Sequence, residues 1–400
     1  MERKVINVGI KSGDLTGSTS LAIQAAIDCL SYVGGGTVKI EKGVYDINTA
    51  IHMRSNVVLE GVSGGTIFKK GKEEGSLTLY DADLHETKVV LKYPELFNVG
   101  QTVTVRKAGK HSFFNDTVAV ITAREGNTCY LDRAMYVTHY VSDNAEVVSN
   151  FPIISGYNVE HAEIRGITID GNKEFNSSTN GCRNAGIYLF ESANILIENC
   201  VVHDYNGDGI SYQNCRDIFV RYCECFENEG LGFHPGSGTT NTEITNCKAT
   251  GNGRDGIFLC WRVTKSLVEN CISVSNKASG LSIGHKDTHN IIRNNEFSNN
   301  LFHGIFFRNE PYPMGADFNL VENNLVKNNG SDGSPYGLCN IRLMGGTNNV
   351  RLVNNRIIFE SVPADKTVGI CLEENTFDIF LEGNEFMNCK KEIYSRCTLD

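Results

Sequence analysis

Long apolar runs, clusters of basic residues and proline are what this sequence most clearly lacks. No run of about 18 apolar residues occurs, so we expect no segment that spans a membrane. No Lys/Arg-rich segment occurs and the formal net charge is −10, which argues against a nucleic-acid surface. Proline accounts for only 7 of 400 residues, whereas glycine accounts for 40. Asparagine recurs through the second half, and this composition is typical of many turns between short strands.

The opening residues and the cysteines bear on the cellular compartment. The first residues, MERKVINVGIKSGD, are mixed and polar, unlike a secretory leader. We expect a cytoplasmic protein, or a secreted one if a leader preceded this chain. The 14 cysteines stand mostly at core-like repeat positions, which indicates reduced thiols acting as small apolar side chains. Cys223 and Cys225 are too close in sequence for a usual zinc pair, so we expect no metal or other cofactor.

A repeat of about 24 residues dominates the chain from Tyr157 onward. Each coil begins where a glycine precedes an apolar residue. The starts are Ile187, Ile210, Phe233, Ile257, Leu281 and Ile305, followed after longer coils by Leu338 and Ile370. Segments such as NILIENCVV alternate apolar and polar residues, as half-buried strands do. Three such strands with turns fill a coil, which predicts an all-β, right-handed parallel β-helix.

A second ladder of residue pairs runs in register with the coil starts. Its members are Asn199-Cys200, Tyr222-Cys223, Asn246-Cys247, Asn270-Cys271, Asn294-Asn295, Asn323-Asn324 and Asn354-Asn355. Asparagine tolerates the left-handed backbone conformation of a tight turn and can hydrogen-bond its own backbone there. We therefore interpret this ladder as structural.

Residues 19–33 predict an amphipathic helix, because Ile23, Ile27 and Leu30 fall on one stripe and three glycines follow. A solenoid needs its open end covered, so we expect this helix to cap the β-helix. The stretch SLAIQAAIDCLSYVGGGTVKIEKGVYDINTAIHMRSNVVLEG resembles the opening of the pectate lyase (pectin lyase-like) superfamily, with its capping helix, GGGTV strand and Gly-x-Tyr turn. The resemblance implies a right-handed β-helix and leaves the reaction open among lyases, hydrolases, epimerases and phage tailspikes.

Residues 74–156 interrupt the repeat. Segments such as LFNVGQTVTVRK and TVAVITAREGNTCYLDRA predict an antiparallel β lobe. The lobe is inserted between residues 1–73, which hold the cap and the first coils, and residues 157–400, which form the main β-helix. It could bind substrate, contact a second copy in a homo-oligomer, or serve structure alone, and the sequence leaves these roles open.

One face of the predicted β-helix could carry chemistry. After each starting glycine the first and third residues are apolar and should point inward, so the second and fourth should point outward. These outward positions and the bend that follows them gather aromatic, cationic and histidine side chains, including the single tryptophan. Aromatic rings beside polar and cationic groups suit a sugar ring. The alternative is an ordinary solvated sheet face.

The candidate catalytic residues are those that can transfer a proton or neutralise a carboxylate: His234, His285, Lys286, Glu310, Arg308 and Asp255. The candidate substrate-binding residues are Trp261, Arg262, Phe258, Phe306, Gln213 and Tyr188. His234 fits a plain surface residue equally well, and Asp255 precedes a glycine, as turn residues often do. A calcium site of pectate lyase type would need clustered aspartates on this face, and the sequence shows none there.

The segment GLGFHPGSGTTNTEITNCKATGNGRDGIF resembles the catalytic coil of mannuronan C5-epimerase modules, whose motif is Tyr-Gly-Phe-Asp-Pro-His. Gly232, Phe233 and Pro235 match that motif. The residues that stand in place of its tyrosine, catalytic aspartate and histidine are Leu231, His234 and Gly236. The motifs of the polygalacturonases are not found here as a set.

Three functions remain open from the sequence, all with an oligosaccharide or polysaccharide partner. The first is β-elimination or C5-epimerisation of a uronate-containing glycan, which needs a base and a cation beside the carboxylate. The second is a glycoside hydrolase or transglycosidase, which needs a carboxylate pair, such as Glu310 with Asp287. The third is a non-catalytic glycan-binding or tailspike-like module. The cationic bias of the outward face favours an anionic sugar, and hence the first.

Overall fold

The computed structural model describes residues 4–109, 114–331, 337–360 and 366–396. The chain divides into two compact units. The N-terminal unit comprises Met1–Leu189 and Val202–Ser211, and the C-terminal unit comprises Phe190–Val201 and Tyr212–Asp400. The division falls inside three strands, β17 (Ala185–Phe190), β19 (Val201–His203) and β20 (Asp208–Gln213).

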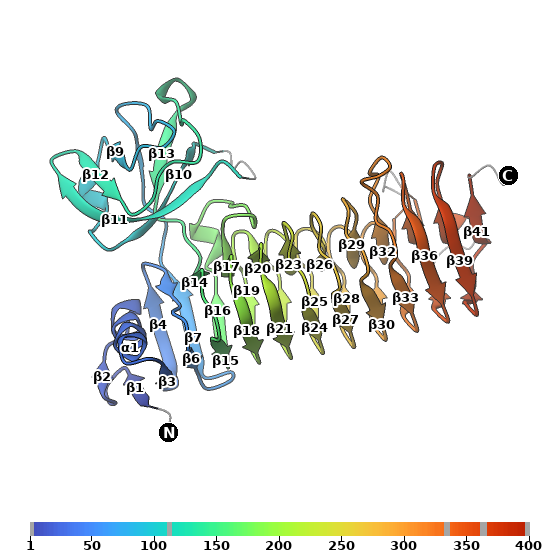
Figure 1. Ribbon diagram of the computed structural model, residues 1–400, viewed down its shortest axis with the longest axis horizontal. Coiled ribbons are helices and arrows are strands. Elements are labelled where there is room, and N and C mark those ends of the chain that lie inside the picture. Colours follow the sequence, from blue (N-terminus) through green and yellow to red (C-terminus); the bar gives the residue numbers. More distant parts are fainter. Residues whose placement is uncertain (1–3, 110–113, 332–336, 361–365, 397–400) are drawn as a thin grey trace. The chain divides into compact units, whose positions relative to one another are not determined.

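In the C-terminal unit each coil contributes short parallel strands to three sheets, which we call A, B and C (Figure 1). Sheet A contains β18 (Ala193–Glu198), β21 (Arg216–Arg221), β24 (Glu243–Thr245), β27 (Leu267–Glu269), β30 (Ile291–Arg293), β33 (Leu320–Glu322), β36 (Asn348–Val353) and β39 (Phe377–Glu382). Sheet B contains β22 (Glu224–Phe226), β25 (Lys248–Thr250), β28 (Ile272–Val274), β31 (Glu296–Ser298), β34 (Leu325–Lys327), β37 (Arg356–Ile358) and β40 (Glu385–Met387). Sheet C contains β23 (Phe233–Gly236), β26 (Ile257–Phe258), β29 (Leu281–Ile283), β32 (Ile305–Phe307), β35 (Cys339–Leu343), β38 (Val368–Leu372) and β41 (Lys391–Ser395).

The strand register confirms the predicted repeat and corrects it at one coil. Phe233 pairs with Ile257, Ile257 with Leu281 and Leu281 with Ile305, so these coil starts stack directly. The next partner of Ile305 is Ile341, not Leu338. The Gly337-Leu338 pair that marked the expected start lies just before β35. This coil is longer than its neighbours, so its sheet C strand begins later in the sequence. In sheet A strands such as β18 and β21 alternate residues are buried, as the apolar-polar alternation predicts, whereas β20 and β23, which lie in the sheet C row, are buried at every position.

The Asn ladder has the predicted backbone conformation, but its hydrogen bonds run between coils. Its first members, from Asn199 to Asn354, have φ of 53° to 57°. The second members are buried, and Asn295 Nδ2 donates to Asn324 Oδ1 at 2.9 Å, as Asn324 does to Asn355 at 3.0 Å. A second row of buried amides runs through Asn252, Asn276, Asn300, Asn329 and Asn340. Side-chain amides therefore hold neighbouring coils together instead of bonding their own turn.

The N-terminal unit contains the predicted capping helix, which follows two short strands in the chain. Helix α1 (Ser20–Tyr32) follows Thr19 at the N-cap position and buries Ile23, Ile27 and Leu30. Beside it, sheet A contains β2 (Leu15–Thr16), β1 (Val5–Gly9), β3 (Gly36–Ile40), β6 (Val57–Glu60) and β15 (Glu163–Arg165). Sheet B here contains β4 (Gly43–Ile47), β7 (Thr66–Lys70) and β16 (Ile167–Asp170), and sheet C contains β5 (Ile51–His52) and β14 (Ile154–Tyr157). Short 3₁₀ helices lie at Pro94–Leu96, Val141–Asp143 and Lys173–Phe175.

A fully buried lysine lies in this unit. Lys70 Nζ donates to Asn150 Oδ1 at 2.7 Å and to Asn206 Oδ1 at 2.8 Å, and it lies 4.5 Å from the centre of the Tyr205 ring. Burial lowers the pKa of Lys70 from 10.5 to about 7. The amide oxygens and the aromatic face make this cation tolerable in the interior.

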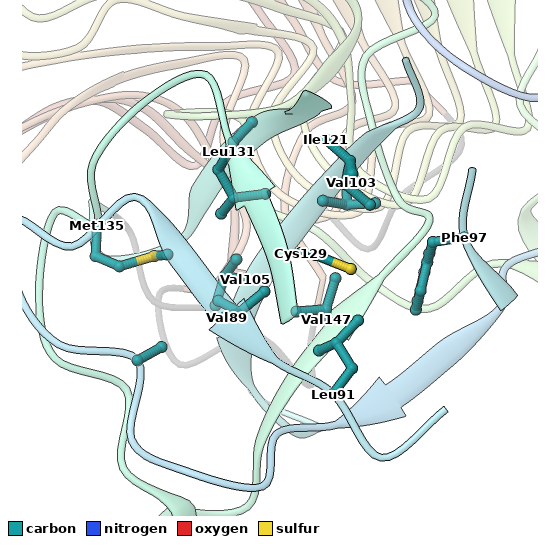
Figure 2. Packing of buried hydrophobic residues seen from close by; sticks show 12 residues of the cluster. Val89, Leu91, Phe97, Val103, Val105, Ile121, Cys129, Leu131, Met135 and Val147 are labelled. Atoms are coloured by element: carbon teal, nitrogen blue, oxygen red, sulfur yellow. The ribbon is translucent and has the colours of Figure 1, made fainter. Parts of the chain in front are cut away.

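The lobe within residues 74–156 is an antiparallel sheet. Its strands, in spatial order, are β8 (Gly75–Leu77), β13 (Ala145–Val148), β10 (Thr102–Lys107), β11 (Thr117–Glu125), β12 (Thr128–Leu131) and β9 (Lys88–Val90). Figure 2 shows its own apolar core, in which Phe97, Met135 and Cys129 lie among branched aliphatic side chains. Because the lobe packs around its own core, it can be inserted in the chain without disturbing the packing of the coils that precede and follow it in sequence.

Candidate active site at the corner after sheet C

The candidate site lies in the C-terminal unit, where three neighbouring strands of sheet C end. We call the residues that follow β26, β29 and β32 the site corner: Trp261–Arg262, His285–Lys286 and Arg308–Glu310. Trp261 and Arg262 have φ of 58° and 64°, and His285 and Lys286 have φ of 49° and 69°. Bulky side chains rarely adopt this left-handed conformation, and each instance costs about 1–3 kcal/mol. Backbone bonds such as Arg262 N to His285 O, at 3.1 Å, hold the strained turns in place.

Three side chains from successive coils form one row at this corner. The Trp261 and His285 rings stack with centroids 4.5 Å apart and planes 12° apart. His285 Nδ1 lies 3.0 Å from Glu310 Oε1. Trp261 is 38% exposed, and the side chains of His285 and Glu310 are 26% and 21% exposed. A carboxylate at Nδ1 favours the tautomer in which Nδ1 donates to Glu310, leaving Nε2 as the basic nitrogen. The row is therefore an oriented imidazole beside a partly exposed aromatic face.

Arg308 lies back along sheet C instead of projecting into solvent. Its Nη2 donates to Leu259 O at 2.8 Å and Asp287 Oδ2 at 3.1 Å, and its Nη1 donates to Ser282 Oγ at 3.0 Å. Gly284 makes room for it, since a Cβ there would lie 2.8 Å from Arg308 Cβ. The expectation that Arg308 grips a substrate carboxylate is therefore corrected, because both its Nη1 and its Nη2 donate within the protein.

Asp287 is the buried partner of that guanidinium. Its side chain is 0% exposed, its Oδ1 accepts from Val263 N at 2.8 Å, and its Oδ2 accepts from Gly284 N at 2.9 Å. Burial raises the pKa of Asp287 from 3.8 to about 6, although Arg308 and the two amides oppose the shift. Both oxygens are held and none of the side chain reaches solvent, so Asp287 organises the turn and does not face a substrate.

Several of the predicted residues pack around the ring of Phe258. Arg308 Cζ lies 4.3 Å from the ring centre, and the His234 ring meets it edge-on at 5.5 Å. Arg254 approaches the same ring from 5.8 Å. His234 is only 3% exposed, so it does not meet solvent as a surface base would. Phe306, half-buried, packs at 5.0 Å against the ring of His303.

The remaining cations of the corner differ in how they are held. Lys286 Nζ donates to Pro313 O at 2.9 Å. Arg262 is exposed, and among the residues that the structure describes its guanidinium makes no ion pair or side-chain hydrogen bond. Arg262 is therefore the cation of the corner that is best placed to meet an anionic ligand.

Three other predicted residues are buried within the fold. Tyr188, in the N-terminal unit, is 0% exposed, and its hydroxyl donates to Cys182 O at 2.8 Å. Gln213 is 1% exposed, with its amide against Gly236. Asp255 is 6% exposed, and its Oδ1 accepts from Ser279 N at 2.9 Å. Burial raises the pKa of Asp255. The expectation that these side chains face a substrate is wrong. Strand alternation predicts to which side of the sheet a side chain points, but it does not predict whether neighbouring residues cover that side chain.

Sequence reasoning missed a set of exposed aromatic side chains farther along the same corner: Tyr312, Phe318 and Phe377. The signal was present, because Phe318 occupies a turn position at which other coils carry polar residues such as Asn349. Within the described ranges, no group of three or more His, Cys, Asp or Glu side chains is arranged to hold a metal ion. No helix in the described residues is long and apolar enough to cross a membrane.

The comparisons with known proteins agree with this architecture. The family model for the right-handed beta helix region matches residues 123–297, 185–357 and 238–398. The chain belongs to this right-handed β-helix family. The predicted pectate lyase-like fold is thereby confirmed. No curated protein sequence matches the chain.

Solved structures similar to this β-helix protein include enzymes and an adhesin. The A-module of a mannuronan C-5 epimerase from Azotobacter vinelandii is 15% identical, with a TM-score of 0.58, and the match covers 98% of this chain and 100% of that one. A polygalacturonase from Erwinia carotovora is 12% identical, with a TM-score of 0.59 and 100% and 97% coverage. The surface adhesin PfbA of Streptococcus pneumoniae is 12% identical, with a TM-score of 0.54 and 97% and 93% coverage. At such identities the likeness shows the fold alone.

Proposed function

We propose that this β-helix protein is a carbohydrate-active enzyme that removes the proton α to the carboxylate of a uronate residue in a glycan. The row of Trp261, His285 and Glu310 carries the proposal. Proton abstraction needs a base held in one tautomer, and Glu310 holds His285 in that way. The exposed face of Trp261 suits the apolar face of a sugar.

The reaction that fits one oriented base is β-elimination. His285 Nε2 takes the proton from C5 of the uronate, the electron pair forms the C4–C5 double bond, and the C4–O glycosidic bond breaks. The protonated imidazole can then return its proton to the departing oxygen. Arg262 neutralises the uronate carboxylate, whose charge grows as the proton leaves. C5-epimerisation shares the first step but needs a second group that delivers a proton to the opposite face.

The alternative of glycoside hydrolysis is less well supported by the geometry. That chemistry uses two carboxylic groups that both reach the glycosidic bond. Glu310 reaches solvent, but Asp287 and Asp255 are buried and hold backbone amides. The neighbouring carboxylates that the sequence offered for a pair therefore serve the fold.

The test is incubation with a panel of uronate polymers, including polygalacturonate and alginate. β-Elimination creates an unsaturated uronate that absorbs in the ultraviolet, whereas hydrolysis releases reducing ends without this absorbance. Epimerisation changes the proton NMR spectrum of the polymer without cleaving it. If the panel gives neither absorbance nor an epimerised product, the proposal is wrong.

A further inference from the structure

Exposed aromatic side chains continue beyond the site corner in the C-terminal unit. Phe318 is 51% exposed and stacks on His289 with centroids 5.1 Å apart and planes 20° apart. Tyr312 is 68% exposed and lies 5.8 Å from the ring of Phe377, which is 43% exposed. Single exposed rings occur elsewhere in the chain, but exposed rings grouped on neighbouring coils are the kind of surface that marks a binding site.

Phe318 is unfavourable for folding in two respects: its backbone conformation is strained and its aromatic ring is exposed. Its φ is 56°, and the residues at the matching turn in neighbouring coils are His289, Asn349 and Asp378, with φ of 58°, 49° and 52°. Asparagine and aspartate adopt this conformation readily, whereas a phenylalanine is strained there. An exposed ring in a strained turn contributes little to folding. Because Phe318 also lies beside His289 and next to the site corner, we take this combination as evidence for a role outside folding.

These rings are continuous with the candidate site. The segment 309–316 carries both Glu310, which bonds to His285, and Tyr312, which contacts Phe377. Gly346 N donates to Glu310 O at 2.7 Å, so the next coil fixes this segment. Single bridges join Thr264, Thr288, Asp317 and Asn348 coil by coil, and Asn348 pairs with Phe377. The rings thus extend about 19 Å from the coil of Trp261, at about 4.8 Å for each of four coil steps.

We propose that Phe318, Tyr312 and Phe377 form a stacking track for an extended glycan whose reacting residue lies at His285. This inference rests on the proposed function and names its substrate class as a polysaccharide instead of a short oligosaccharide. Polar residues occupy the matching positions in neighbouring coils: Asn348 pairs with Phe377, and Asn349 and Asp378 stand at the turn position of Phe318. A sugar chain matches that pattern, because each ring has an apolar face and a hydrogen-bonding rim.

The experiment measures binding across a length series of uronate oligomers, from disaccharide to polymer. The background is His285→Asn, in which we expect turnover to be most strongly suppressed and the residues of the track are unchanged. Phe318→Asn and Tyr312→Ala are added to it singly. Each should weaken binding of the polymer by about threefold to tenfold, the range expected for one aromatic stacking contact, and should change binding of the disaccharide little.

The matched control is Tyr222→Asn. Tyr222 is also an exposed aromatic residue in a left-handed turn, with φ of 53° and 58% exposure, but it lies at the corner between sheets A and B. Both asparagine variants should unfold at the same or a higher temperature than the parent, because both relieve backbone strain. Only Phe318→Asn should lose affinity for polymer.

Three outcomes would overturn the track. One is affinity that does not rise with glycan length, and another is a Phe318→Asn variant that binds polymer as well as the parent. The third is a dimer in sedimentation that Tyr312→Ala converts to monomer, which would assign the surface to a second copy of the chain. If the proposed function alone is wrong, the unsubstituted protein turns over no uronate polymer yet still binds it in a length-dependent way that Phe318→Asn weakens.

Discussion

His285 Nδ1 and Glu310 Oε1 lie 3.0 Å apart, although the two residues belong to different coils. The contact exists because the turns after β29 and β32 are stacked, with Ile283 of one strand paired to Phe307 of the next. The imidazole is thereby oriented by a carboxylate on one side and by the Trp261 ring on its face. Each of these contacts can be tested separately.

Loss of the proposed base should abolish most of the activity without loss of the fold. We expect His285→Asn to lower kcat by about 10²- to 10⁴-fold, the usual contribution of a general base. Glu310→Gln should cost less, about ten- to a hundredfold, because it disturbs only the orientation of the ring. The measurement is the rate at which ultraviolet absorbance increases with the uronate polymer that the parent protein cleaves fastest. The control is His161→Asn, at an exposed left-handed turn of the N-terminal unit; equal losses in His161→Asn and His285→Asn would refute the assignment.

Replacement of Arg308 should destabilise the protein in a pH-dependent way. Arg308→Gln leaves the buried Asp287 carboxylate without its cation, which typically costs about 3–5 kcal/mol. The folded-state pKa of Asp287 is already raised to about 6. In the parent, the folded state therefore holds a proton that the unfolded chain releases, and stability is lost as pH rises from about 4 through 6. Removal of the Arg308 cation raises the pKa of Asp287 further, so the cost of Arg308→Gln should grow as pH rises above about 6.

The comparison for Arg308→Gln is Arg293→Gln, which removes a more exposed ion pair with Glu269. That loss should cost no more than about 1 kcal/mol. Urea unfolding at several pH values measures both variants. A cost for Arg308→Gln that is as small as that for Arg293→Gln, or that shrinks as pH rises, would contradict the buried-pair description.

Lys70 should make stability rise in alkaline solution. Its folded-state pKa is about 7, against 10.5 for an unperturbed lysine, so the unfolded chain binds more protons between these values. Stability should increase across that interval by about 1.4 kcal/mol for each unit of pKa difference. Lys70→Met should remove this slope in urea unfolding measurements, and Lys69→Met, at the exposed neighbour that pairs with Asp170, should leave it. Parallel slopes in the two variants would show that Lys70 is not the source.

The amide ladder predicts an unequal effect of two neighbouring substitutions. Asn295→Ala removes the acceptor of Cys271 N and the donor to Val268 O, and buried groups left without partners cost about 1–3 kcal/mol each. Cys271→Asn instead extends the row of amides by one coil and should change the free energy of unfolding by less than about 1 kcal/mol. Thermal unfolding measures both, and a larger loss for Cys271→Asn would count against the ladder as the source of stability.

The fold could be predicted from the sequence because its repeat is local and regular. A glycine followed by an apolar residue recurs in each coil, and strands of period two need no long-range information. Leu338 was misplaced as a coil start because the Gly-Leu pair there precedes the strand in a lengthened coil. The helix at 20–32 was predicted within a residue at each end, since its apolar stripe and its glycines both mark it.

The sequence predicted where the candidate site lies, but it did not predict the direction of every side chain in it. Coil phase brought Trp261, His285 and Glu310 to one corner, but it could not show that Arg308 lies back across the sheet to reach Asp287. A long side chain spans more than one coil, and its direction depends on the space left by a residue such as Gly284. Burial of Gln213 likewise depends on neighbours in the next coil, which strand alternation does not specify.

The rows of asparagine amides also have a direction. Asn295 donates to Asn324, Asn324 to Asn355, and Asn355 to Asn384, each time toward the C-terminal coil. The amides of the second row, from Asn252 to Asn340, donate in the same sense. Their dipoles therefore add, and each bond polarises the next, as in any hydrogen-bonded chain within a medium of low dielectric constant. Each row of amides therefore has a single electrical polarity, and we expect interruption of one amide to weaken the adjacent bonds of the same row.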